Sequence, residues 1–246
     1  MTDVPIETLI ACGIITFASA VQTAIGFGLA LIAVPILLLI NPDMVPAPIL
    51  MVAFVQLSLN SWAHRKHINW RPLVYAFIGR IPGTLLAVWA LTATGLAGIQ
   101  VFIGLAVLMA VALSLGNWKM ASSNINHFWA GSVAGFTGTT SAIGGPPIAL
   151  LYQHEQGDKV RANLSAFFVL GSVMSFAGMA WAGAVTQQSF HYAALFIPAA
   201  IVGFWLGIKT KHWLQPRFMR PAILILCGSS GLAVLWQALA ALEIVL

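Results

Sequence analysis

Eight long apolar runs, separated by short loops, make up most of this sequence. They cover approximately residues 6–40, 46–63, 73–93, 97–115, 128–152, 162–182, 191–208 and 221–242. A helix needs about 20 apolar residues to cross a bilayer, and six of the runs have roughly that length. Only 7% of the residues are charged, whereas a soluble domain carries about 25%. The sequence therefore predicts an all-α, multi-pass membrane protein with no room for an extramembrane domain.

Two of the runs, 6–40 and 128–152, are unsuited to a single crossing. A continuous helix over the first would extend about 52 Å, against a hydrocarbon core of about 30 Å. Each run contains glycines and polar residues in its middle, at 22–28 in the first and at 139–147, with two prolines, in the second. Proline removes a backbone donor, and glycine permits non-helical dihedral angles. Both runs are therefore expected to break inside the membrane.

The basic residues predict which loops face the cytoplasm. Lysine and arginine occur in loops 64–72, 116–127, 153–161 and 209–220 but not in the N-terminus or in loops 41–45, 94–96 and 183–190. Basic loops are cytoplasmic in membrane proteins, which explains the net charge of +5 without a nucleic-acid partner. In the inner membrane of a cell, Lys66 and Lys211 would then face the cytoplasm, and Asp3 and Glu243 would not. Each broken run begins and ends on one side, which predicts two re-entrant hairpins that enter from opposite faces.

The two halves of the chain also resemble each other weakly, as where Gly26 aligns with Gly144 at a separation of 118 residues. Each predicted half, residues 1–120 and residues 121–246, contains one hairpin and three crossings. An odd number of crossings inverts the second copy relative to the first. This is the inverted-repeat organisation of many secondary transporters, whose broken helices meet near the midplane. The alternative is a single long, tilted helix over 6–40 and an accidental repeat.

The two hairpin tips are the candidate binding site, because non-helical backbone at membrane depth is stable only when it is buried in protein or lines an aqueous cavity. A half-helix is expected to begin near Leu29 and another near Pro147. Each helix N-terminus carries unpaired N–H groups and about half a positive charge, so two such ends can bind an anion. The alternative is that the small residues only allow helices to pack closely. The residues expected at the tips are Gln22, Thr23, Gly26, Phe27, Gly28, Thr139, Thr140, Ser141, Gly144, Gly145 and Pro146.

Arg80 is a further candidate binding residue, because it is the one basic residue well inside a predicted crossing, about 10 Å from its start. An arginine at this depth indicates a functional role by default. The alternative is that its side chain extends to the cytoplasmic headgroups. Gln56 and Asn60 lie four residues apart on one helix face, where they either line the pathway or bond to a neighbouring helix.

None of the six acidic residues lies deep in a crossing. Carboxylates are the usual proton relays of membrane carriers, so a carboxylate-coupled cation or proton carrier is disfavoured. Anions leave a cell down a negative-inside potential with a gain of about 2.3 kcal/mol per charge per 100 mV, so an anion exporter needs no relay. Coupling stays open, because His127 or His154 near the end of a run could carry a proton. The histidines are too scattered to form a metal site, and no cofactor is expected.

The sequence around the two breaks resembles the TauE/SafE family, the sulfite exporter type of membrane permease. The similarity lies in residues 26–35 (GFGLALIAVP) and in residues 138–147 (GTTSAIGGPP), which run on to LYQ at 151–153. The order of the apolar runs and the total length also agree, so the resemblance covers essentially the whole chain. It implies the export or exchange of small sulfur-containing anions such as sulfite or sulfonates.

Two other functions stay as alternatives. The first is transport of another small anion, because neutral donors suit sulfate, nitrate, a carboxylate or a halide equally well. The second is an intramembrane enzyme, because residues 228–231 (GSSG) match the G-x-S-G of rhomboid-type proteases. That chemistry needs a histidine base, and no histidine follows His212, so the enzyme is disfavoured. The expected partners are a small anionic substrate and the lipid bilayer, and the sequence leaves the oligomeric state open.

Overall fold

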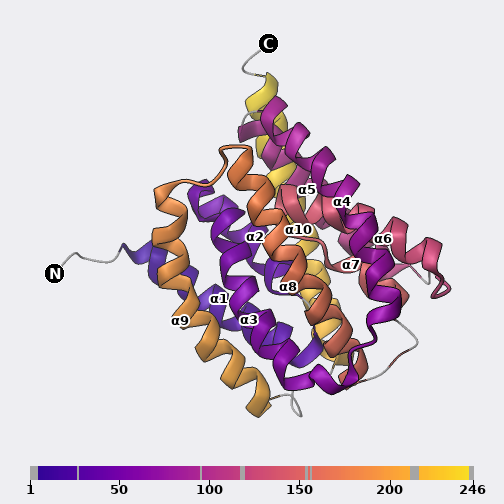
Figure 1. The fold of residues 1–246 in the computed structure, drawn as a ribbon. Coiled ribbons are helices and arrows are strands. Elements are labelled where there is room, and N and C mark those ends of the chain that lie inside the picture. The colour runs from indigo at the N-terminus through magenta and orange to yellow at the C-terminus, as the bar shows by residue number, and fades with distance from the viewer. Residues whose placement is uncertain are drawn as a thin grey trace.

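The computed structural model describes residues 5–26, 28–94, 96–116, 120–152, 155, 157–210 and 216–243. Over these residues it consists of helices and loops, as the apolar runs predict (Figure 1). Two 3₁₀ turns, Pro42–Met44 and Arg65–His67, flank the third α-helix. The described α-helices are α1 Ile6–Ile25, α2 Leu29–Ile40, α3 Ala47–His64, α4 Trp70–Ala93, α5 Leu96–Leu115, α6 Asn124–Ser141, α7 Gly145–Leu151, α8 Asp158–Trp181, α9 Gln187–Thr210 and α10 Pro216–Glu243.

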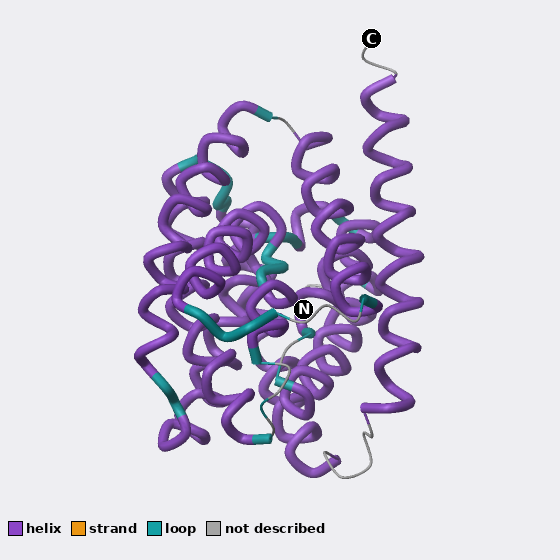
Figure 2. The backbone as a smooth tube through the Cα atoms, turned by 90° about the vertical axis from the view of Figure 1, so that its right-hand side faces the viewer, coloured by secondary structure: helices purple, strands orange, loops and turns teal. Residues whose placement is uncertain are grey.

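Six of the described helices combine the length and the apolar composition of a membrane crossing, namely α1, α3, α4, α5, α8 and α9. Helix α10 has 28 residues, which is also enough to cross a bilayer, and it stands at the edge of the bundle where the chain leads to the C-terminus (Figure 2). The large side chains of Trp89, Trp181 and Trp236 are 67%, 87% and 77% exposed. An outer surface this apolar is stable in lipid rather than in water. The chain is therefore a multi-pass membrane protein.

Two helix pairs pack closely because glycines leave room for the neighbouring backbone. Helix α1 lies against α9, and helix α4 lies against α6 (Figure 1). In each pair the contacts advance by four residues along both helices, so the two helices are parallel. A Cβ atom added at any of these glycines would lie 1.9–2.6 Å from a carbonyl oxygen of the partner helix, which no side chain tolerates. The glycines and the residues that they face are Gly203 on Thr16, Gly207 on Ala20, Gly79 on Phe128 and Gly83 on Ser132.

The first break lies further along the chain than its polar residues predict. Gln22 and Thr23 belong to α1, which has 20 residues and so extends about 30 Å, the thickness of the hydrocarbon core. The expectation of a tip over 22–28 is therefore wrong at its start, because hydrogen bonds from other helices allow these polar side chains to remain helical. The break occurs at Gly26 and Gly28, whose φ angles of +105° and +131° favour glycine.

Helix α2 turns back along α1. The backbone N–H of Leu29 donates to Gln22 Oε1 at 2.8 Å, so α2 begins beside the last turns of α1. At its other end, Asn41 Nδ2 donates to Tyr192 Oη at 3.2 Å, near the start of α9. Because α9 is parallel to α1, run 6–40 begins and ends at the same end of the molecule. The alternative of one long, tilted helix is wrong.

Helices α6 and α7 form a second reversal. Thr139 and Ser141 belong to α6, and the turn consists of residues 142–144, with Ala142 at a φ of +59°. A Cβ atom on Gly144 would lie 2.7 Å from the Ala134 carbonyl oxygen, so the chain has already folded back beside α6 at this point. Helix α7 has seven residues and extends about 10 Å, which is too short to cross a bilayer.

One end of the molecule collects the described basic residues other than the buried Arg80. His64 Nε2 lies 3.5 Å from Asp158 Oδ1, which joins the end of α3 to the start of α8. Arg161 Nη2 donates to the Ala24 carbonyl oxygen at 2.9 Å, which brings the end of α1 to the same place. Lys119, Lys211 and Asp3 lie outside the described residues. The basic residues at this end also include Arg65, Lys66, Arg71, Lys159 and Lys209.

Candidate functional site

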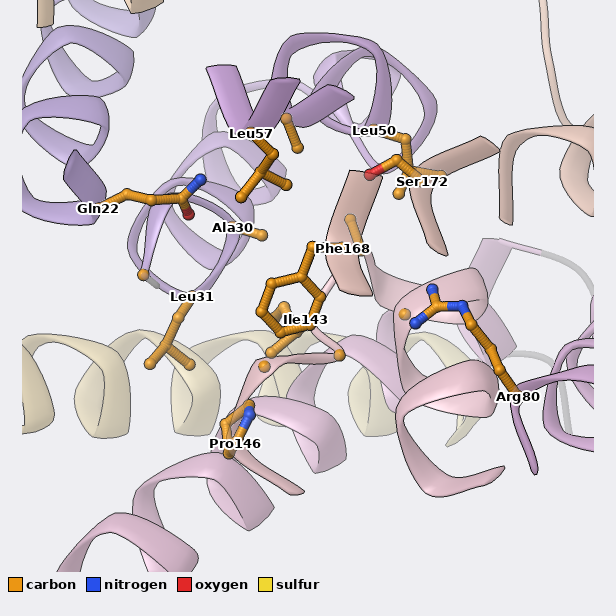
Figure 3. A pocket seen from close by; sticks show the side chains of 16 residues that line it. Gln22, Ala30, Leu31, Leu50, Leu57, Arg80, Ile143, Pro146, Phe168 and Ser172 are labelled. Atoms are coloured by element: carbon orange, nitrogen blue, oxygen red, sulfur yellow. The ribbon is translucent and has the colours of Figure 1, made fainter. Parts of the chain in front are cut away.

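A cavity of about 50 Å³ lies inside the bundle, between the two hairpins and helices α3, α4 and α8 (Figure 3). One water-sized position needs about 10–15 Å³, so the cavity has room for a few waters or one small solute. Among its lining residues Arg80 is the only charged one. The lining residues are Gln22, Gly28, Ala30, Leu31, Leu50, Ala53, Leu57, Arg80, Gly138, Ala142, Ile143, Gly144, Gly145, Pro146, Phe168 and Ser172.

Arg80 reaches the cavity between three glycines. A Cβ atom on Gly171 would lie 2.5 Å from Arg80 Cζ, and one on Gly138 would lie 2.8 Å from Arg80 Nη2. A Cβ atom on Gly135 would lie 3.1 Å from Arg80 Cγ. The missing side chains on α6 and α8 therefore provide the space that the arginine occupies. The alternative of extension to the headgroups is wrong, because Arg80 is 2% exposed and its guanidinium group points toward the cavity (Figure 3).

The guanidinium group of Arg80 is only partly hydrogen-bonded. Its Nη2 donates to the Gly171 carbonyl oxygen at 3.1 Å and to Ser175 Oγ at 2.9 Å. Its Nε and Nη1, which carry three N–H bonds, are buried and have no partner in the protein. The Cζ atom lies 5.1 Å from the centre of the Phe167 ring, within cation–π range. A buried cation with unused donors is energetically costly, so this group is suited to receive an anion.

The polar groups of the first hairpin bond to one another. Gln22 Oε1 accepts the Leu29 N–H at 2.8 Å, and Gln22 Nε2 donates to Gln56 Oε1 at 3.3 Å. Gln56 Nε2 in turn donates to the Ser19 carbonyl oxygen at 2.8 Å and to Thr23 Oγ1 at 3.1 Å. Of the two roles predicted for Gln56, bonding to a neighbouring helix is the one observed, because it lies outside the cavity lining.

The hydroxyl groups of the second hairpin are also bonded within the protein. Thr139 Oγ1 lies 2.9 Å from Ser175 Oγ, the hydroxyl that accepts from Arg80. Thr140 Oγ1 donates to the Phe136 carbonyl oxygen at 2.9 Å. Ser141 Oγ donates to a carbonyl oxygen of its own helix at 2.6 Å. Of the three, only Thr139 is connected to Arg80.

The helix N-termini at the two breaks offer fewer donors than a generic helix start. The first N–H of α2, on Leu29, is already bound by Gln22 Oε1. In α7, Pro146 and Pro147 occupy the first turn and have no N–H to donate. The main concentration of unused donors in the described site is therefore the arginine side chain rather than the helix termini.

Comparison with known proteins identifies the family. The family model described as "Sulfite exporter TauE/SafE" matches residues 10–234. The chain belongs to the TauE/SafE family. A relative described as "Probable sulfite/organosulfonate exporter TauE", from Cupriavidus necator, is 23% identical over 210 residues, which cover 81% of this chain and 82% of the relative. No solved structure matches the chain.

TauE/SafE proteins are membrane transporters and not enzymes, so the GSSG segment at 228–231 is not a protease motif. In the structure, a Cβ atom on Gly231 would lie 2.8 Å from Val107 Cγ1. This glycine therefore allows α10 to pack against α5. No cluster of three or more metal-binding side chains occurs in the described part of this TauE/SafE protein.

Half of the predicted site residues line the cavity of this TauE/SafE protein. Thr23, Gly26 and the hydroxyl residues of the second hairpin lie outside the lining. The hydroxyl groups of Thr23 and Thr140, for example, donate to carbonyl oxygens of their own helices. Phe27 lies outside the described residues. The part that each residue has in substrate binding stays a prediction. The predicted residues that line the cavity are Gln22, Gly28, Arg80, Gly144, Gly145 and Pro146.

Ser172 and Phe168 line the cavity although the sequence arguments did not single them out. Ser172 lies between Gly171 and Ser175 on one face of α8, and this cluster of small residues in an apolar run was a usable signal. Phe168 had no such signal, because an aromatic residue in an apolar helix usually faces lipid or core. Which face of a helix meets a cavity depends on its packing partners.

Proposed function

We propose that this TauE/SafE transporter carries a small sulfur-containing oxyanion, such as sulfite or a small sulfonate, and that Arg80 binds it. The observation that carries the proposal is the buried guanidinium group of Arg80, whose Nε and Nη1 have no protein partner and which lines a small cavity. The family description and the name of the relative support a sulfur-containing substrate. The residues of the cavity support only the conclusion that the substrate is an anion, and not that it contains sulfur.

The electrostatics of the cavity favour an anion over a cation or a neutral solute. Arginine keeps its charge, and hydrogen bonds to charged groups contribute about 1.5–3 kcal/mol each. A monovalent cation placed about 4 Å from Arg80 would be repelled by about 4 kcal/mol at an effective dielectric constant of about 20. Ser172 Oγ and the amide of Gln22 supply further donors, and the lining residues include no carboxylate.

The volume of the cavity favours a compact inorganic oxyanion in this conformation. About 50 Å³ corresponds to a few water-sized positions of about 10–15 Å³ each. A sulfonate with an organic tail would need Phe168 or the α3 wall to move. Donors of this kind discriminate poorly among oxyanions, so transport of sulfate or nitrate is the second candidate function.

The inverted repeat of residues 1–120 and 121–246 is also a proposal. If the two halves correspond, α1 corresponds to α6 and α4 corresponds to α9. The parallel pair α1–α9 then corresponds to α6–α4, which is also an observed parallel pair. In the same way, α3 packs against its counterpart α8, α5 packs against its counterpart α10, and the contact of α2 with α10 corresponds to that of α7 with α5. These pairings support an inverted repeat whose halves rock around the shared cavity.

The proposed direction is export. The end with Arg65, Lys66 and Arg161 is cytoplasmic by the positive-inside rule. A negative-inside potential then drives an anion outward by about 2.3 kcal/mol per net charge per 100 mV. Labelling of single cysteines from both sides tests this orientation, and an accessible position 66 on the outside would contradict it.

Counterflow in proteoliposomes tests the substrate and the role of Arg80 together. We expect exchange of labelled sulfite, and less or none of labelled sodium or rubidium. Arg80→Gln should lower the exchange rate by about 10- to 100-fold, the equivalent of one charge-assisted hydrogen bond, and Arg80→Lys should lower it less. Arg71→Gln, which changes an exposed arginine of the same helix, is the matched control. Cation exchange without anion exchange, or a fully active Arg80→Gln that elutes as a folded protein, would contradict the proposal.

A further inference from the structure

A buried histidine and a buried tyrosine join the two arms of the second hairpin away from its turn. His127 lies in the first turn of α6 and is 1% exposed, and Tyr152 follows the last residue of α7 and is 3% exposed. Their ring centroids are 5.9 Å apart, with the planes at 81°. Neither residue lines the cavity, so the anion site does not account for this pair.

The hydrogen bonds of His127 identify the atom that can take up a proton. Its Nδ1 lies 2.9 Å from the Ser123 carbonyl oxygen. A carbonyl oxygen only accepts hydrogen bonds, so Nδ1 carries the hydrogen of the neutral imidazole and Nε2 has a free lone pair. This Nε2 atom is buried and has no partner in the protein, and the same holds for the hydroxyl group of Tyr152. Two unpaired polar atoms on adjacent buried rings are unusual in a folded protein.

Few charged groups surround this pair among the described residues. Glu155 follows Tyr152 in the chain and is exposed, and burial together with Glu155 raises the pKa of the tyrosine. Tyr152 therefore remains a neutral hydroxyl that can accept a hydrogen bond. Helix α5, which also packs on α6, has no titratable side chain. At the same end, α4 carries Arg71 and Tyr75, which are exposed, and α8 carries Asp158, Lys159 and Arg161, of which Asp158 and Arg161 form an ion pair.

We propose that His127, with the Tyr152 hydroxyl beside it, is a proton-binding site that couples anion transport to a pH gradient. The proposal rests on the proposed anion transport. A proton adds to the Nε2 lone pair, and the imidazolium N–H that forms donates to the Tyr152 oxygen through one water. No other bond changes, and the proton returns to water when Nε2 becomes accessible from the other side. Each proton that moves with the anion lowers the net charge carried per cycle by one.

The second hairpin provides the physical link between the two sites. Helix α6 runs from His127 to Gly138, which lines the cavity and packs against the guanidinium group of Arg80. The separation is 11 residues, or about 16 Å along the helix. A proton bound at the open end of the hairpin and an anion bound near its turn both act on the position of the same helix. By linkage, each changes the affinity for the other by the same factor.

The test separates exchange from net transport. Proteoliposomes loaded with labelled sulfite and the pH dye pyranine are given a pH step for net efflux, and counterflow is measured separately at equal pH on both sides. In the wild type, we expect the pH step to accelerate efflux and the dye to report proton movement that requires sulfite. In His127→Gln, which keeps a neutral amide in place of the imidazole, counterflow should stay within about two-fold of the wild type, whereas both pH-driven signals should be lost. His191→Gln changes an exposed histidine on α9 and should retain them.

Two outcomes would overturn this proposal. One is a wild-type protein that exchanges sulfite without any sulfite-dependent proton signal, and the other is a His127→Gln variant that keeps that signal. A wild type that exchanges no anion would contradict the proposed function instead. Tyr152→Phe keeps the ring and removes the hydroxyl, so it provides a second variant if His127→Gln fails to insert. It should retain counterflow and slow the pH-driven efflux several-fold, and an unchanged pH response would count against the proposal.

Discussion

The two hairpins differ in how they satisfy their polar groups. In the first, Gln22 binds the start of α2 and is itself bound by Gln56, so the amides are largely paired within the protein. In the second, Thr139 contacts Ser175, which accepts from an arginine whose other nitrogens have no partner. The chain therefore places the unused hydrogen-bonding capacity on one side of the cavity. The two hairpins therefore need not have the same role.

We therefore expect the two hairpins to have different roles. The first hairpin has a paired amide network and a turn that Arg161 fixes by a hydrogen bond to the Ala24 carbonyl oxygen, so its polar residues mainly maintain the break in the helix. The second hairpin adjoins the free donors of Arg80, so changes there should act on the anion. Variants of the two regions should separate into those that affect binding and those that affect stability.

The largest effect is expected at the glycines around Arg80. Gly171→Ala places a Cβ atom 2.5 Å from Arg80 Cζ, so the guanidinium group must move away from its hydrogen bonds to α8. Overpacking by a single methyl group in a close-packed interior costs about 1–3 kcal/mol, and the displaced charge should lower sulfite counterflow by at least about 10-fold. Gly13→Ala is the control, because a Cβ atom there has nothing within 4 Å. Normal transport by folded Gly171→Ala would show that the position of Arg80 is not critical.

A smaller effect of a different kind is expected in the first hairpin. Gln22→Ala removes the acceptor of the Leu29 N–H and leaves Gln56 Oε1 without its donor. Loss of a buried hydrogen-bond partner costs about 1–3 kcal/mol, so the midpoint of thermal unfolding in detergent should fall. Because Gln22 also lines the cavity, the KM for sulfite should rise, but by less than three-fold. Gln237→Ala truncates an exposed amide on α10 and should leave both quantities unchanged. A large rise in KM without loss of stability would remove the proposed distinction between the hairpins.

The sequence predicts the helical fold well and the detail of the breaks less well. Hydropathy and glycine content are properties of local segments, so the apolar runs predict the helices. The charge pattern predicts the end of the molecule at which the basic residues gather. The sequence predicts that Gln22 and Thr23 break the first run, but both bond to Gln56 of α3, and Thr23 also bonds to the α1 backbone, so they remain helical. The glycines, prolines and polar residues of the two breaks located the region of the cavity. The free donors of Arg80 depend on Gly171 in a distant helix, which no local pattern reveals.

The smallest expected change in free energy, about 1 kcal/mol, comes from a comparison of two adjacent hydroxyls of the second hairpin. Thr139 Oγ1 contacts Ser175 Oγ and is thus one step from Arg80, whereas Thr140 Oγ1 donates to the backbone of its own helix. In Thr139→Val, the Ser175 hydroxyl loses a hydrogen bond worth about 1 kcal/mol and no longer holds Arg80 Nη2 as firmly. The KM for sulfite should therefore rise about two- to five-fold, with kcat unchanged, because the change acts on binding.

Thr140→Val is the matched variant, since it removes the same atom from the next residue at equal burial. A threonine that bonds to the carbonyl four residues earlier competes with its own helix, so its loss should cost little stability and leave KM unchanged. Equal KM values for the two variants would mean that the hydroxyl chain through Ser175 does not position Arg80. The second hairpin would then influence the anion only through the space that its glycines provide.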